Sequence, residues 1–217
     1  TIRAMSEVAV SKGKSILNYI EVLKPRESSL HILMGVIAAL IAARGSLPLC
    51  PFILSIAAIA CGIPGANGLT NYFDRNIDAK MQRTCLRALP SRRIYPPRRA
   101  LPLIVSLIIV GLTLTWFIHP LCFICGLVGV IAAALWRKTS WEVFLGIVAS
   151  CAPVLIGWFA IRPVFDLQIL SICLLVAVWI PLHVWSVMVA YRDDYRNAGL
   201  CYFPLGWEVA RSVKLLF

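Results

Sequence analysis

The chain has 217 residues, of which 60% are hydrophobic and only 14% are charged, and its mean hydropathy is +0.83. This composition is far too apolar for an ordinary soluble domain of that length, so it favours a protein whose solvent is the bilayer. The net charge of +11 comes from basic residues that are spread among loops and form no aromatic-interleaved patch, so no nucleic-acid partner is expected.

Apolar runs recur along the whole chain, and a helix needs roughly 20 such residues to cross the hydrocarbon core. The fold class they indicate is an all-helical, polytopic membrane bundle with six complete spans and the start of a seventh near residue 207, and residues 1–217 form one membrane domain. The complete spans are predicted near 28–43, 50–72, 100–118, 121–136, 141–161 and 167–191.

Lysine and arginine collect in every second loop. Five precede the first span, eight lie between the second and third, two lie between the fourth and fifth, and two follow the sixth, whereas the other loops carry one, none and one. Basic residues accumulate on the cytoplasmic side of a membrane. The N-terminus and the basic loops are therefore expected on the cytoplasmic face of the cytoplasmic membrane or, in a eukaryote, of the mitochondrial inner membrane.

The second span ends in a polar stretch, "NYFDRNIDAKMQRT". If the helix continues through it, Asp74 and Asp78 project from one face with Asn71 one turn earlier, and a positive group is expected beside the two like charges. A second acidic pair, Asp193 and Asp194, follows the sixth span. Loop parity puts both pairs on the same side of the membrane, so they can converge on one site.

Carboxylates at a membrane surface suit Mg²⁺, which takes one or two of them and completes its shell with water and substrate phosphate oxygens. A diphosphate is the obvious bridging ligand. The candidate metal ligands are Asn71, Asp74, Asp78, Asp193 and Asp194.

Basic residues follow the first acidic pair, and Lys80, Arg83 and Arg87 are candidates for direct phosphate contacts, because guanidinium groups match phosphate oxygens in bidentate geometry. The alternative is that basic residues here are solvated loop charges that only orient the helices. That alternative is preferred for four later residues of the same loop, Arg92, Arg93, Arg98 and Arg99.

The sixth span carries His183 on the helical face that leads to Asp194, about 16 Å deeper at 1.5 Å per residue. An ionisable residue at that depth is by default a functional candidate. Together with Trp185, Tyr191 and Tyr195, it is expected to line a pocket for the acceptor or for an apolar chain. A packing role stays open for His183 and Trp185.

Three further features are read as structural. The eight cysteines lie mostly in apolar runs, where a thiol behaves as a small hydrophobe, and they predict no disulfide framework. His31 is expected to be a surface or packing residue, and Trp179 a packing or interface residue. The small-residue ladder Ala58, Gly62 and Ala66 is expected to let the second span approach a neighbour closely.

Two stretches carry a family resemblance. Residues 71–87 read N-Y-F-D-x-x-I-D-x-x-M-x-R-T-x-x-R, and residues 181–199 contain P-x-H-x-W followed by D-D-Y-x-x-A-G. These stretches resemble the two signature regions of UbiA-type intramembrane prenyltransferases. The second most resembles the branch that farnesylates haem, the protohaem IX farnesyltransferases, whereas the quinone branch would show D-x-x-x-D where this chain has Tyr191 and Tyr195.

The resemblance implies a mechanism in which Mg²⁺ is the cofactor, farnesyl diphosphate and haem b are the substrates, and the reaction takes place in the bilayer. It also implies a membrane partner from the haem pathway. Members of the family carry further spans, so it implies that the C-terminal part of the domain is missing. The expected catalytic residues are Asp74, Asp78, Asp194, Arg83 and Arg87, and the expected diphosphate-binding residues are Lys24, Arg26, Lys80, Arg83 and Arg87.

Two other interpretations stay open. One is a prenyltransferase of the same superfamily that acts on a quinone precursor or a lipid acceptor. The other is a non-enzymatic haem-binding or isoprenoid-binding membrane protein, which would have no use for the acids. A transporter is disfavoured, because the acids cluster at one surface and transporter sites lie near the bilayer midplane.

Overall fold

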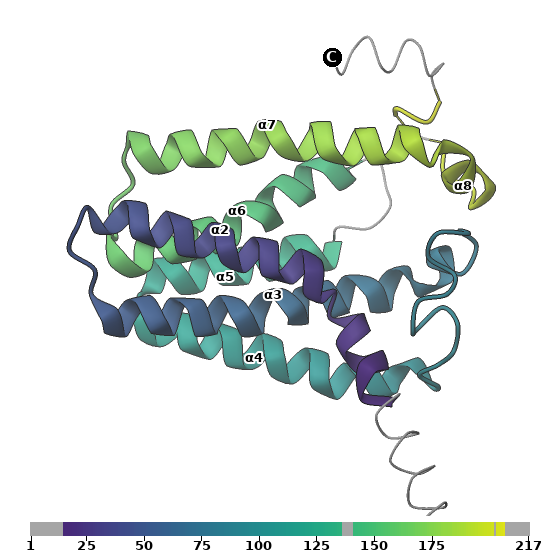
Figure 1. The fold of residues 1–217 in the computed structure, drawn as a ribbon, viewed down its shortest axis with the longest axis horizontal. Coiled ribbons are helices and arrows are strands. Elements are labelled where there is room, and N and C mark those ends of the chain that lie inside the picture. Colours follow the sequence, from purple (N-terminus) through teal and green to yellow (C-terminus); the bar gives the residue numbers. More distant parts are fainter. Residues whose placement is uncertain (1–14, 136–140, 202, 207–217) are drawn as a thin grey trace, which may run out of the picture.

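A computed structural model describes residues 15–135, 141–201 and 203–206. All the regular structure in these ranges is helical, as the composition predicts (Figure 1). A helical segment over 15–22 precedes the named elements. These are α2 (Pro25–Ala43), α3 (Leu49–Asp78), η1 (Pro97–Ala100), α4 (Leu101–Ile118), α5 (Pro120–Leu135), α6 (Glu142–Ile161), α7 (Leu167–Ala190) and α8 (Arg192–Asn197).

Each of the six predicted spans corresponds to a helix. Five are long and apolar enough to cross a membrane, namely α2, α3, η1 with α4, α6 and α7, while α5 is equally apolar but has 16 residues. The second helix is longer than its predicted span, because its 30 residues include the polar stretch up to Asp78. The seventh predicted span, near 207, lies outside the described residues.

Close helix packing in the bundle depends on small residues. A side chain on Gly111 of α4 would place its Cβ 2.8 Å from Gly62 Cα and 3.0 Å from the Ala58 carbonyl oxygen, so α3 and α4 touch backbone to backbone where the small-residue ladder predicts a close approach. On the other side of the bundle, a Cβ on Gly157 of α6 would lie 2.1 Å from the Gly35 carbonyl oxygen of α2. In a bilayer, lipid gives no hydrophobic driving force for helix association, so close van der Waals packing at such contacts holds the helices together.

The polar segments gather at one end of the bundle. Figure 1 shows α8, the C-terminal end of α3 and the loop that follows α3 together at this end, on the right of the view. The N-terminal end of α2 runs toward the same end. The two acidic pairs predicted to converge are therefore carried by neighbouring segments.

We expect Gly157→Ala to destabilise the protein by about 1 to 3 kcal/mol, because the added methyl group would have to displace the backbone of α2. Thermal unfolding in detergent micelles would measure the loss. Gly62→Ala is the matched control, since its new Cβ would meet nothing closer than Gly111 Cα at 4.0 Å. Equal stability of the two variants would contradict the close α2–α6 contact.

Candidate functional site

A cavity of about 290 Å³ lies at the polar end of the bundle, among α2, α3, α6 and α7. The acids of α3 line one part of it, and α7 supplies a largely apolar wall through Ile180, Val184 and Val187. One space thus contains charged groups near the end of the bundle and apolar surface toward its interior. Such a space suits a ligand with a charged head and an apolar body.

One face of α3 contributes two acids to the cavity wall. Asp74 and Asp78 are buried, with 7% and 2% of their surface exposed, and both line the cavity together with Asn71. Asn71 Nδ2 donates a hydrogen bond to the Val22 carbonyl oxygen at 2.7 Å, which ties this face to the segment before α2. The predicted alignment of the three residues is confirmed, because α3 stays helical to its last turn.

Positive groups accompany these acids, as expected for like charges on one face. Arg87 Nη1 lies 3.1 Å from Asp78 Oδ2, and the Thr84 hydroxyl donates to the Asp78 carbonyl oxygen at 2.9 Å. Lys24 and Arg83 also line the cavity. Loss of water lowers the pKa of Lys24 and the nearby Arg87 lowers it further, whereas the surrounding carboxylates raise it.

The donor set fits Mg²⁺ of the kind that is shared with a substrate. Asp74, Asp78 and Asn71 offer hard oxygen ligands on one face, and Mg²⁺ needs only one or two carboxylates when phosphate and water complete its octahedron. Among the described residues no group of three or more His, Cys, Asp or Glu side chains is close enough to hold a metal by itself. The arrangement therefore fits an open site and not a closed structural one.

The second acidic pair has a different position. Asp194 accepts hydrogen bonds from the backbone N–H groups of Gln82 and Arg83, at 2.5 and 3.1 Å, and so fixes the loop that carries Arg83. Asp193 is exposed. Neither residue is part of the cavity wall, so in this structure the pair is adjacent to the acids of α3 in the fold but does not share the cavity with them.

The two tyrosines after α7 both interact with Arg83. Tyr195 is buried and lines the cavity, and burial raises the pKa of its hydroxyl, with a further upward effect of Glu142. Tyr191 is 47% exposed and does not line the cavity, and its ring lies 5.0 Å from the guanidinium carbon of Arg83. Tyr191 is therefore a partner of Arg83 instead of a wall residue.

The aromatic wall differs from the one predicted. His183 lines the cavity and stacks on Trp179, with ring centroids 4.9 Å apart and planes within 7°. Trp185 instead packs edge-on against Phe203 at 5.0 Å, away from the cavity. The helical period explains both outcomes, because Trp179 is four residues from His183 and shares its face, whereas Trp185 is two residues away and lies on the opposite side.

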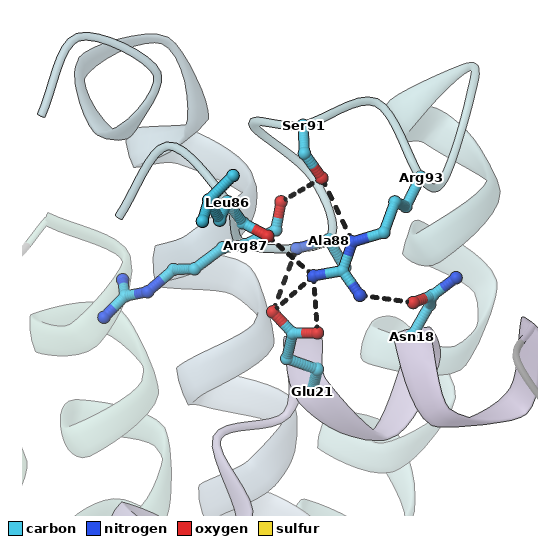
Figure 2. Close-up of polar contacts among 7 residues, drawn as sticks. All are labelled: Asn18, Glu21, Leu86, Arg87, Ala88, Ser91 and Arg93. Atoms are coloured by element: carbon cyan, nitrogen blue, oxygen red, sulfur yellow. Dashed lines mark hydrogen bonds and ion pairs between the residues drawn. The ribbon is translucent and has the colours of Figure 1, made fainter. Parts of the chain in front are cut away.

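The loop after α3 is held by a clamp that the sequence did not reveal. Arg93 donates to both carboxylate oxygens of Glu21, at 2.9 and 2.7 Å, to Asn18 Oδ1 at 2.6 Å and to the Leu86 carbonyl oxygen at 2.7 Å (Figure 2). Figure 2 shows the Arg87 guanidinium directed away from these contacts. Arg93, expected to be a solvated loop charge, thus fixes the segment from which Arg87 reaches Asp78.

Several cavity residues were missed. His31, Asn67 and Thr70 line the cavity, and helical spacing could have identified Asn67 and Thr70, which lie one turn before Asn71 and Asp74. Ser150 also lines it, and its buried hydroxyl has no hydrogen-bond partner among the described residues. The wall also includes Glu27 and Glu142, whereas Arg26 and Lys80, predicted as phosphate contacts, are exposed outside it.

Comparison with known proteins places this geometry in a family context. Residues 31–217 match the UbiA prenyltransferase family. The chain is 34% identical over 207 residues to the protoheme IX farnesyltransferase of Desulforudis audaxviator, covering 91% of this chain and 65% of the relative. It is 33% identical over 199 residues to the protoheme IX farnesyltransferase of Korarchaeum cryptofilum, covering 89% of this chain and 67% of the relative.

The fold is also similar to that of a solved protein. A UbiA homologue from Archaeoglobus fulgidus, bound to DMAPP and Mg²⁺, superposes with a TM-score of 0.77 at 16% identity, covering 92% of this chain and 72% of that one. The chain spans about two thirds of the length of the two protoheme IX farnesyltransferases, 65% of the first and 67% of the second.

We expect Arg93→Ala to loosen the loop after α3. The substitution removes the charge-assisted hydrogen bonds that tie this loop to Asn18 and Glu21 in the helical segment over 15–22. Backbone amides at 84–92 should exchange with deuterium roughly tenfold faster. Arg98→Ala removes the same charge from an exposed position and serves as the control. Unchanged exchange in Arg93→Ala, or equal acceleration in both variants, would contradict a specific clamp.

Proposed function

Because the chain belongs to the UbiA prenyltransferase family, we propose that it transfers a farnesyl group from farnesyl diphosphate to a vinyl group of haem b, giving haem O. The observation that carries this proposal is the cavity, in which Asp74 and Asp78 lie beside Lys24, Arg83 and Arg87 and adjoin an apolar wall. Acids for a metal, cations for a diphosphate and apolar surface for a hydrocarbon are thereby combined in one space. The names of the relatives support haem as the acceptor.

We propose Asp74 and Asp78, with Asn71, as the residues that hold Mg²⁺, and we keep Asp193 and Asp194 as further ligands to be tested. When bound, Mg²⁺ supplies positive charge that stabilises the departing diphosphate. The solved homologue with DMAPP and Mg²⁺ supports this use of the fold. Of the two acids after α7, Asp194 also fixes the backbone from which Arg83 extends.

The cations of the cavity act on the leaving group. When the bond between C1 of the farnesyl chain and oxygen breaks, its electron pair leaves with the diphosphate, and Arg83, Arg87 and Lys24 stabilise that negative charge. Arg26 and Lys80 lie outside the wall, so we assign them to attraction of the diphosphate before it enters.

The allylic cation left behind needs a nucleophile and protection from water. The apolar surface of α7 delays capture by water, so the π electrons of the acceptor vinyl group form the new carbon–carbon bond. Water then adds to the resulting cation and loses a proton, which leaves a hydroxyethylfarnesyl side chain. No side chain of the protein has to act as a nucleophile.

We assign the acceptor to the α7 side of the cavity. His183 and Trp179 present a flat stacked pair there, and a planar macrocycle can lie against such a surface or offer its iron to the imidazole. Tyr195 of α8 also lines the cavity. His183 is therefore proposed to position the acceptor, while the acids of α3 hold the donor.

We propose that the N-terminus and the polar end of the bundle lie on the cytoplasmic face, where soluble farnesyl diphosphate is accessible. The concentration of basic residues in alternate loops supports this orientation. We further propose that residues 1–217 form a single UbiA-like domain, and that a membrane partner from the haem pathway delivers haem b or receives the product.

Asp74→Ala is expected to lower transfer roughly a hundredfold or more at saturating Mg²⁺, because the diphosphate would lose charge stabilisation in the transition state. The measurement is incorporation of radiolabelled farnesyl into haem b in membranes that contain the protein. Arg98→Ala is the control and should keep the wild-type rate. A wild-type rate in Asp74→Ala would refute the metal-site assignment.

His183→Ala should reduce farnesyl transfer to haem b about tenfold, because the acceptor loses its positioning group, and should leave the affinity for farnesyl diphosphate within a factor of two. Transfer rates at varied haem b and binding of labelled farnesyl diphosphate separate the two effects.

The identity of the acceptor is tested in the same assay with a panel that also contains a quinone precursor and a lipid acceptor. Transfer to one of these in place of haem b would overturn the acceptor assignment.

A further inference from the structure

A separate pocket of about 300 Å³ lies between the last turn of α3 and the loop that leads into η1. We call it the loop pocket, and its walls are Arg75, Asn76, Ala79, Leu89, Pro90, Arg92, Tyr95 and Pro97. It shares no wall residue with the large cavity. On α3, Arg75 and Ala79 are each one residue, or about 100° of helix, beyond Asp74 and Asp78, so the two spaces use different faces of the helix.

Two arginines supply the charge of the loop pocket. Arg75 Nη1 donates to the Tyr72 carbonyl oxygen, and the guanidinium carbon of Arg75 lies 4.4 Å from the centre of the Tyr72 ring. Neither Arg75 nor Arg92 forms an ion pair with a carboxylate among the described residues, and the Arg92 side chain donates to no acceptor there. Because each guanidinium has five N–H donors, most donors of the two groups are left for a ligand or for water.

The loop pocket has no acid of its own. The sequence contains no Asp or Glu between residues 79 and 141, and none of the wall residues is acidic. Arg93 of the same loop differs, because it donates to Glu21 and Asn18 of the helical segment over 15–22. The fold therefore neutralises Arg93 internally and leaves the positive charge of the loop pocket without a balancing carboxylate in its walls.

The backbone holds Arg92 at the pocket. Its φ is 60°, in the left-handed region that residues with long side chains seldom adopt, and its N–H donates to the Leu89 carbonyl oxygen at 3.2 Å. Leu89 before this turn and Ile94 after it are buried, with 3% and 4% of their surface exposed. The turn is thus anchored on both sides, and the exposed Arg92 side chain extends from a fixed position.

The loop pocket lies where the apolar part of the bundle begins. Pro97, one of its walls, is the first residue of the 22-residue apolar segment formed by η1 and α4, and η1 packs against α3. Farther along α4, Val105 and Ile109 are 44% and 57% exposed and lie one turn apart on the same face. Tyr95 is 65% exposed, and tyrosine is typical of the level where membrane meets water. Polar and apolar surface are therefore available side by side to an amphipathic ligand.

We propose that the loop pocket binds the phosphate group of an anionic glycerophospholipid, whose acyl chains lie along the exposed apolar face of α4. Guanidinium groups bind phosphate oxygens through charge-assisted, bidentate hydrogen bonds, and Asn76 and Tyr95 add polar groups for the rest of the headgroup. A soluble phosphate would satisfy the same cations but would leave the exposed face with Val105 and Ile109 without a ligand. The lipid uses both surfaces, and its site is independent of prenyl transfer.

The experiment measures binding of radiolabelled phosphatidylglycerol to the purified chain, in micelles of a neutral detergent with an excess of phosphatidylcholine. Binding should be saturable. Arg75→Gln and Arg92→Gln should each weaken it about fivefold, and the double variant roughly 25-fold, because each basic group beside an anionic lipid contributes about that factor. Unlabelled phosphatidylglycerol should displace the label, whereas glycerol 3-phosphate and inorganic phosphate at the same concentration should not.

The matched control is the double variant Arg98→Gln with Arg99→Gln. It removes the same two charges from exposed positions just after the loop pocket and outside its walls, so the affinity should stay within a factor of two of the wild type. Thermal unfolding establishes that each variant is folded. Arg92 is exposed, so Arg92→Gln provides the test even if the half-buried Arg75 does not tolerate replacement.

Three results would overturn the proposal. Equal losses in the two double variants would show a general attraction of lipid to basic residues and no specific pocket. Displacement of the label by glycerol 3-phosphate as effectively as by phosphatidylglycerol would make the ligand a soluble phosphate. Binding to the wild type that does not saturate would show that the loop pocket holds no lipid.

Discussion

The ion pair between Asp78 and Arg87 is the constraint on which the site depends. A carboxylate with 2% exposure inside an apolar bundle is costly without a counter-charge, and that charge comes from a loop. The loop must therefore be fixed, and two contacts fix it: Asp194 accepts backbone hydrogen bonds from its first part, and Glu21 binds Arg93 in its later part. Charge balance in the cavity is thus maintained by contacts outside it.

The bundle is also divided into a polar end and an apolar interior. Most charged groups gather where the helices end, and the core between the helices consists mainly of small, aliphatic and aromatic side chains. His31, Asn67 and Thr70 lie at the boundary, each fixed by a hydrogen bond to α2, α3 or α5.

Helical spacing predicted the parts of the site that lie on one helix and failed where two segments meet. Asn71, Asp74 and Asp78 fall on one face because the helical period is a local property of α3. By contrast, the clamp between Glu21 and Arg93 joins residues 72 positions apart, and no local pattern indicates it. The aromatic wall could be predicted in part. The helical period shows that Trp179 and Trp185 lie on different faces of α7, but only the packing of α7 decides that the face with Trp179 meets the cavity.

By itself, the sequence determined the bilayer as solvent, the order of the six apolar helices, the acidic face at the end of α3 and the family signature, because these follow from composition, local periodicity and short motifs. The tertiary structure alone decided which charged residues share a cavity, that Asp194 fixes a loop in this fold, and that a small apolar pocket lies between α3, α4, α5 and α6. Cavities form between helices distant in sequence, and their shape depends on how closely backbones approach at positions such as Gly111 and Gly129. That approach is a property of pairs of helices, which no single segment encodes.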